Sequence, residues 1–227
     1  MNLPQPGDYI DIHVHGGKAA AGIFILESLM AHEEKAAENI PGVAYTYGIH
    51  PWFLNENNYK QQISSVENAM GHSDIIAVGE AGFDKIKGPG RELQYRIFAE
   101  QVLIAEKVKK PVVIHCVRAW DELLSVKKEL RPKMPWLIHG FRGNKELAAQ
   151  LLSKGMYLSF WFDFVLKPES AALLRSLPPG RIFLETDGAE VDIRAIYKKV
   201  SNDLDLSVEE LKSIIRSNYN DFFNLNS

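Results

Sequence analysis

Cysteine is nearly absent from this chain of 227 residues, since Cys116 is the only one. One thiol cannot form an internal disulfide, and this cysteine usage is typical of a reducing compartment. No apolar run reaches the roughly 18 residues that a membrane-spanning helix needs. The opening residues, MNLPQPGDYI, lack the basic region and apolar run of a signal peptide. The sequence therefore predicts a cytoplasmic protein that does not bind a membrane.

An excess of positive charge is also missing, because 26 Lys and Arg face 29 Asp and Glu, giving a net charge of −3. This balance argues against a protein that binds duplex DNA through a basic surface, but not against an enzyme that handles phosphates through metal ions. No low-complexity tract, linker or protein-binding segment is evident. We expect one domain, residues 1–227, without an obligate protein partner.

Short apolar runs alternate with helical segments along the chain. Amphipathic helical patterns occupy 91–109, 145–155 and 207–223, and the last begins with Ser207 and Glu210 at capping-box spacing. Such alternation predicts an α/β protein with a parallel sheet covered by helices. The apolar runs that predict strands are 9–15, 22–26, 43–50, 75–82, 111–116, 136–141, 156–162 and 181–187.

Polar residues at the ends of these runs decide between an open sheet and a closed barrel. An open sheet gathers its ligands near one switch point, whereas a barrel gathers them from the carboxyl ends of many strands. Here they come from the first, third, fourth, fifth, sixth and eighth runs. The sequence therefore predicts a (β/α)8 TIM-type barrel. The residues concerned are His13, His15, His50, Glu80, His115, His139 and Asp187.

The stretch DIHVH predicts part of a metal site. Residues two apart on a strand point to the same face, so His13 and His15 lie side by side, with Asp11 deeper. A pair of hydrogen-bonded core histidines is the alternative. Asp11 and Glu185 each precede a proposed ligand by two positions, and either could orient a ligand histidine or form a buried ion pair.

Four imidazoles and two carboxylates exceed what one catalytic ion usually binds. They suit two divalent ions about 3.5–4 Å apart with a bridging hydroxide. We assign Glu80 as the bridge between the two ions. His13, His15 and Asp187 would hold one ion, and His115 with His139 the other. The residue types do not distinguish Zn, Mn, Co, Ni, Fe or Mg.

Six segments in order resemble the TatD family of metal-dependent hydrolases: DIHVH, YGIHPW, AVGEAGFD, PVVIHC, IHGFRG and FLETD. The similarity covers residues 9–225 and implies a distorted TIM barrel of the amidohydrolase superfamily with divalent-metal-dependent deoxyribonuclease activity. The resemblance implies the same six metal ligands that the residue pattern indicates. It also implies that Asp187 accepts the proton of the attacking water. His50 would bind the substrate phosphate.

The sequence also departs from the family pattern. The first β/α unit is short and lacks its helix. Arg142 stands where a serine is common, and Arg118 lies one position later than the usual arginine. Both arginines could clamp phosphate oxygens or be surface residues of loops. Cys116 should face away from His115, toward the helices.

The predicted reaction is therefore phosphodiester hydrolysis of DNA or a short nucleic acid, and the family implies a 3′-end exonuclease. Glu80 and Asp187 would be catalytic, and His50, Arg118 and Arg142 would bind substrate. An amidohydrolase or deacylase acting on a small carbonyl substrate is the main alternative function. A metal-binding protein without catalytic turnover is the third possible function. Three tryptophans near strand ends could stack on bases or line the core: Trp52, Trp120 and Trp161.

Overall fold

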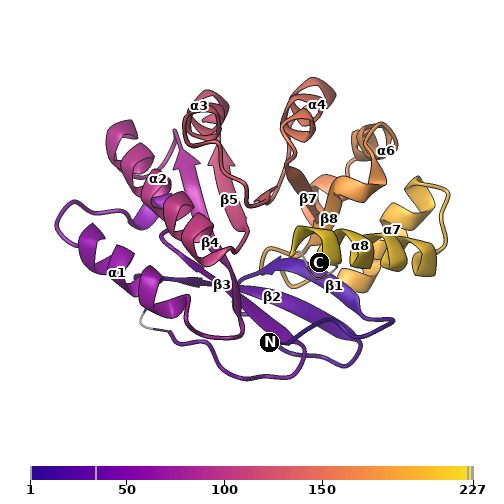
Figure 1. Ribbon diagram of the computed structural model, residues 1–227. Coiled ribbons are helices and arrows are strands. Elements are labelled where there is room, and N and C mark those ends of the chain that lie inside the picture. The colour runs from indigo at the N-terminus through magenta and orange to yellow at the C-terminus, as the bar shows by residue number, and fades with distance from the viewer. Residues whose placement is uncertain (1, 34, 224, 226–227) are drawn as a thin grey trace. The chain divides into compact units, whose positions relative to one another are not determined.

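Eight parallel strands follow one another through one sheet in the order of the sequence. Figure 1 labels all of them except β6. The computed structural model describes residues 2–33, 35–223 and 225. All eight predicted strands are confirmed. They are β1 (Tyr9–Val14), β2 (Ile23–Met30), β3 (Val43–Gly48), β4 (Ile75–Asp84), β5 (Val112–Val117), β6 (Trp136–Ile138), β7 (Tyr157–Trp161) and β8 (Ile182–Glu185).

Helices follow the strands from β3 onward. No helix lies between β1 and β2, or among the described residues between β2 and β3, which confirms the shortened first β/α unit. None of the described helices is long and apolar enough to cross a membrane. They are η1 (Pro51–Phe53), α1 (Tyr59–Ala69), α2 (Arg91–Val108), α3 (Trp120–Leu130), α4 (Lys145–Ser153), α5 (Phe162–Val165), α6 (Pro168–Arg175), η2 (Pro179–Arg181), α7 (Ile193–Asp203) and α8 (Val208–Phe222).

The described chain divides into two compact units, each built from segments that are distant in the sequence. The first unit contains residues 28–39 and 45–137, and the second contains 2–27, 40–44 and 138–227. Strands β2, β3 and β6 contribute residues to both. The single domain over 1–227 stays a prediction.

In the first unit, β4 is buried at every position, and it pairs in parallel with β5. Helix α2 covers β4 with an apolar face at helical spacing that includes Leu93, Ile97 and Val102. Gly82 lies opposite His115, and a Cβ on it would come within 2.0 Å of the His115 carbonyl oxygen. Only glycine therefore lets β4 and β5 approach this closely beside Glu80 and His115.

In the second unit, β8 lies beside β1 as well as β7, the neighbour relation that a closed barrel requires. The Tyr197 hydroxyl on α7 donates to the Ile10 carbonyl (3.0 Å) and accepts from the Ile10 N–H (3.2 Å), which fixes α7 on β1. Helix α8 begins with the predicted capping box of Ser207 and Glu210. Helices α7 and α8 both pack against β1 and β8, whose ends carry site residues.

Candidate metal centre

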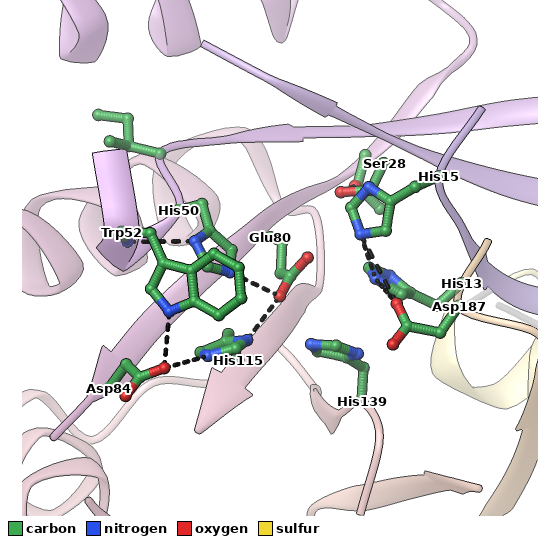
Figure 2. A network of polar contacts seen from close by, with 12 residues as sticks. His13, His15, Ser28, His50, Trp52, Glu80, Asp84, His115, His139 and Asp187 are labelled. Carbon is green, nitrogen blue, oxygen red and sulfur yellow. Dashed lines mark hydrogen bonds and ion pairs between the residues drawn. The ribbon is translucent and has the colours of Figure 1, made fainter. Parts of the chain in front are cut away.

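Three predicted site residues meet in the first unit, one on β4, one on β5 and one just after β3 (Figure 2). The Glu80 carboxylate is buried, with His115 Nδ1 2.8 Å and His50 Nε2 3.1 Å from its Oε1. The ligand atoms of these three residues all lie within 4.8 Å of one another. This set, here the Glu80 cluster, offers two imidazoles and a carboxylate that could hold one divalent ion.

His50 reaches this cluster because the chain turns into η1 directly after β3. Its Nδ1 accepts a hydrogen bond from the Trp52 N–H (3.1 Å), which leaves Nε2 as the ring donor toward Glu80. The ring is only 3% exposed. His50 could bind an ion only through Nε2 after that nitrogen loses its proton, and its assignment to the substrate phosphate stays a prediction.

Asp84 is a member of this network that the sequence-based prediction missed. Its Oδ2 accepts from the Trp52 indole N–H (2.6 Å) and lies 3.2 Å from His115 Nε2. His115 thus has a carboxylate at each ring nitrogen, Glu80 at one and Asp84 at the other, as Figure 2 shows. Asp84 lies four residues after Glu80 on the same strand, so the two side chains point to the same face of the sheet. This spacing is the feature of the sequence that could have identified Asp84 as a site residue.

Asp84 is held in its charged form. Burial raises the pKa of its carboxyl, but hydrogen bonds from the Trp52 indole, the Ile86 and Lys87 N–H groups and His115 outweigh burial and bring the pKa below its ordinary value. A carboxylate at this place can accept the ring proton of His115 and fix which nitrogen of that ring is left to bind a metal.

Replacing Asp84 with asparagine tests this positioning role. The amide lacks the charge that orients the His115 ring, so we expect divalent metal affinity to fall about 10–100-fold. Isothermal titration of the metal-stripped protein with Zn²⁺ or Mn²⁺ measures the change. Asp121→Asn, at an exposed position on α3, is the matched control. Parental metal affinity in Asp84→Asn would contradict the role.

A second set of predicted residues meets in the second unit, at the ends of β1 and β8 (Figure 2). His13 Nε2 and His15 Nε2 lie 3.1 Å apart, as their spacing on the strand predicts. Asp187 Oδ1 is 3.6 Å from the first and 3.7 Å from the second. This set, here the Asp187 cluster, also offers two imidazoles and a carboxylate for one ion.

The backbone around Asp187 fixes the direction of its side chain. Asp187 adopts a positive φ of 53°, and its N–H donates to the His13 carbonyl (3.1 Å). Gly188 follows with φ +76°, and a Cβ there would come within 2.9 Å of the His15 carbonyl oxygen. The turn after β8 therefore needs this Asp-Gly pair to place a carboxylate beside the two histidines.

His139 and Glu185 complete the second unit's site. The His139 ring lies beside that of His13, with centroids 4.1 Å apart, and its Nδ1 is 3.6 Å from Glu185 Oε1. Ser159 donates to the other Glu185 oxygen. Burial raises the pKa of Glu185, but contacts with His139, the nearby His13 and Ser159 outweigh it and lower the pKa. Glu185 is thus placed to orient His139.

Asp11, the other carboxylate on this face, has a different partner. Its two oxygens accept from the Thr186 N–H (2.9 Å) and the Thr186 hydroxyl (2.7 Å). Burial raises the pKa of Asp11 to about 7. Asp11 therefore ties β1 to the end of β8, and its predicted action on a ligand histidine stays a prediction.

The two predicted arginines lie in exposed positions outside the two clusters. Arg118 follows β5, and Arg142 follows β6 with its guanidinium 4.4 Å from the centre of the Trp161 ring. Their phosphate-binding role stays a prediction. Burial raises the pKa of the Cys116 thiol, which keeps it protonated and fits its predicted exclusion from the site.

Sequence comparison relates the chain to metal-dependent hydrolases and nucleases. An "uncharacterized metal-dependent hydrolase" of Buchnera aphidicola is 28% identical over 64% of this chain, which spans 58% of that relative's length. A human protein named 3′-5′ RNA nuclease TATDN2 is 34% identical over 62% of this chain and 19% of its own length. A "3′-5′ ssDNA/RNA exonuclease TatD" of Cronobacter sakazakii is 29% identical over 70% of this chain and 63% of its own.

Comparison with solved structures supports the fold. A TatD homologue from Escherichia coli superposes with a TM-score of 0.79 at 19% identity, covering 97% of this chain and 99% of that one. A TatD-family hydrolase from Entamoeba histolytica gives 0.78 at 18% identity, covering 95% and 97%. The predicted (β/α)8 TIM-type fold is thereby confirmed. The sequence model of the family described as "TatD related DNase" matches residues 21–224, and the chain belongs to this family.

Proposed function

We propose that this chain is a metal-dependent hydrolase that cleaves phosphodiester bonds in nucleic acid. The observation that carries the proposal is the presence of two His-His-carboxylate sets on or directly after the strands, one in each unit. Family membership supports it, because the family is described by deoxyribonuclease activity and two relatives carry nuclease names.

The donor atoms fit two divalent ions, one for each cluster. Imidazole combined with carboxylate suits Zn, Mn, Co, Ni or Fe, and such sets suit Mg less well. Such ions, when bound, would lower the pKa of a water molecule and neutralise charge that develops on the phosphate. The assignment of Glu80 to both ions, and the pairing of His115 with His139 on one ion, stay predictions.

Side chains of the protein would accept the proton, orient the ligand histidines and bind the phosphate. The Asp187 side chain is 22% exposed, so it can meet solvent and accept the proton of the attacking water. Asp84 and Glu185 orient His115 and His139. In the predicted substrate role, His50 would keep its Nε2–H and donate it to a non-bridging phosphate oxygen, and it would then bind no ion.

The proposed substrate is DNA or a short single-stranded nucleic acid, attacked from its 3′ end. The relatives named for 3′-5′ nuclease activity support this polarity. The net charge of −3 favours short or single strands over a long duplex. The cytoplasmic location and the absence of an obligate protein partner stay predictions of the sequence.

Metal removal and restoration test the proposed function. Metal-stripped protein should not cleave single-stranded DNA or RNA, and added Mn²⁺, Zn²⁺ or Mg²⁺ should restore cleavage. Oligonucleotides labelled at the 5′ or the 3′ end report polarity, and a panel of acyl amides is assayed in parallel. Metal-dependent amide hydrolysis without cleavage of either nucleic acid would overturn the proposal in favour of the amidohydrolase alternative.

A further inference from the structure

A cavity of about 470 Å³ lies in the second unit between the loop that follows β6 and the segment of α5 and α6. This size falls within the range of roughly 300–1,000 Å³ that small-molecule pockets occupy. Its polar lining includes Arg142, Lys145 and Lys167, and its apolar lining includes Phe164 and Leu173. The residues of neither cluster line it, and we call it the β6–α6 cavity.

Positive charge dominates the lining of the cavity. Glu169 is the single acidic side chain beside three basic ones. Lys167 lies 3.9 Å from Asp163, but both side chains are about half exposed, and such a pair is weak. Within the described chain, neither Arg142 nor Lys145 forms an ion pair with a carboxylate. The cavity therefore has unneutralised cations available for an anion.

Arg142 is held in a geometry that suits a phosphate. Its guanidinium carbon lies over the Trp161 ring, 4.4 Å from the ring centre. A guanidinium beside an aromatic ring keeps N–H groups that can donate to two phosphate oxygens. Lys145 and Lys167 add point charges from two other segments.

The lining also includes apolar side chains. Phe164, Ala172 and Leu173 provide carbon surface, with Phe164 and Leu173 mostly buried. A purely ionic ligand such as sulfate would leave this surface exposed to water. A nucleotide unit combines a charged phosphate with a base and a sugar, and grooves that bind single strands combine cations with aromatic groups in the same way.

The loop after β6 connects this cavity to the site. His139, a candidate ligand, and Arg142 are three residues apart, so their Cα atoms lie within roughly 11 Å even if the loop is fully extended. That separation is on the scale of one or two nucleotides. We propose that the β6–α6 cavity binds a nucleotide unit of a single strand next to the phosphodiester that is cleaved. This inference rests on the proposed function, and it names the place where the strand is held.

Removing two of the cations tests the inference. The variant Lys145→Ser/Lys167→Ser and its parent are assayed on a single-stranded 12-mer and on the p-nitrophenyl ester of thymidine 5′-monophosphate, which has one nucleotide. Because each lysine would make a charge-assisted contact with the strand that the ester lacks, we expect the ratio of kcat/KM on the 12-mer to that on the ester to fall about tenfold or more. The slope of log kcat/KM against log salt for the 12-mer should weaken by about 0.7 per lost contact.

The matched control removes the same charge elsewhere in the second unit. Lys154→Ser/Lys198→Ser changes two exposed lysines outside the cavity, one of them at the far end of α4. We expect the control to keep the parental ratio and salt slope. An unchanged ratio in Lys145→Ser/Lys167→Ser, or an equal loss in the control, would overturn the inference.

Binding separates failure of the inference from failure of the proposed function. Should the parent protein cleave neither substrate, fluorescence anisotropy with a labelled 12-mer still measures how tightly the strand binds. Loss of binding in Lys145→Ser/Lys167→Ser and its retention in the control would then support the cavity as a strand-binding site without catalysis. Equal binding of all three proteins would overturn it.

Discussion

The substitution Glu80→Gln is expected to lower kcat/KM on single-stranded DNA by more than about 100-fold and to reduce the metal content of the purified protein. Loss of a group that only orients a ligand costs roughly 10–100-fold, and Glu80 faces the ion itself in our proposal. Its oxygen lies between His115 and His50, so its charge is the only one that the Glu80 cluster offers to a cation. Glutamine preserves the shape and removes this charge.

The fold should survive this change, because glutamine leaves a buried amide with two histidines near enough to hydrogen-bond it. Elemental analysis measures the metal content, and circular dichroism checks the fold. Glu122→Gln is the matched control, since Glu122 is also buried in the first unit but pairs with Lys85 (2.8 Å) outside the cluster. Parental metal content and rate in Glu80→Gln would refute the role that we propose for Glu80.

The apolar runs and the alternation of side chains along a strand predicted much of the fold and part of the site. Alternation along a strand brings His13 and His15 together without knowledge of any other contact, and their ring nitrogens do meet. The end of β6 was less predictable. The strand stops at Ile138, before the predicted end at 141, and Gly140 has a positive φ of 57°. His139 consequently lies just after the strand, beside His13.

Contacts between distant segments explain what the sequence did not predict. The role of Asp84 depends on a hydrogen bond from Trp52, which is 32 residues away and placed by the η1 turn. His50 enters the Glu80 cluster through the same turn. Neither hydrophobic periodicity nor the spacing of residues predicts the direction that the backbone takes after a turn. The β6–α6 cavity likewise needs the loop after β6, the start of α4 and the segment of α5 and α6 in place before its cations converge.

The proton-accepting role proposed for Asp187 predicts a result distinct from that for Glu80. We expect Asp187→Asn to lower kcat by about 10²–10⁴-fold at saturating metal, the usual contribution of a general base. Asparagine tolerates the positive φ at this position, and the backbone hydrogen bond to His13 is unaffected. Its amide oxygen can still bind a cation, but the amide cannot accept a proton at neutral pH.

Metal titration together with single-turnover rates separates the two roles of Asp187. Asp205→Asn is the matched control, because Asp205 has nearly the same φ, 55°, and an exposed side chain outside both clusters. The control should match the parent in rate and metal affinity. A large fall in rate with most of the metal affinity kept would support proton acceptance by Asp187. A loss of metal affinity large enough to account for the whole fall would mean that Asp187 acts only as a ligand, and the proton would then have to leave through another group.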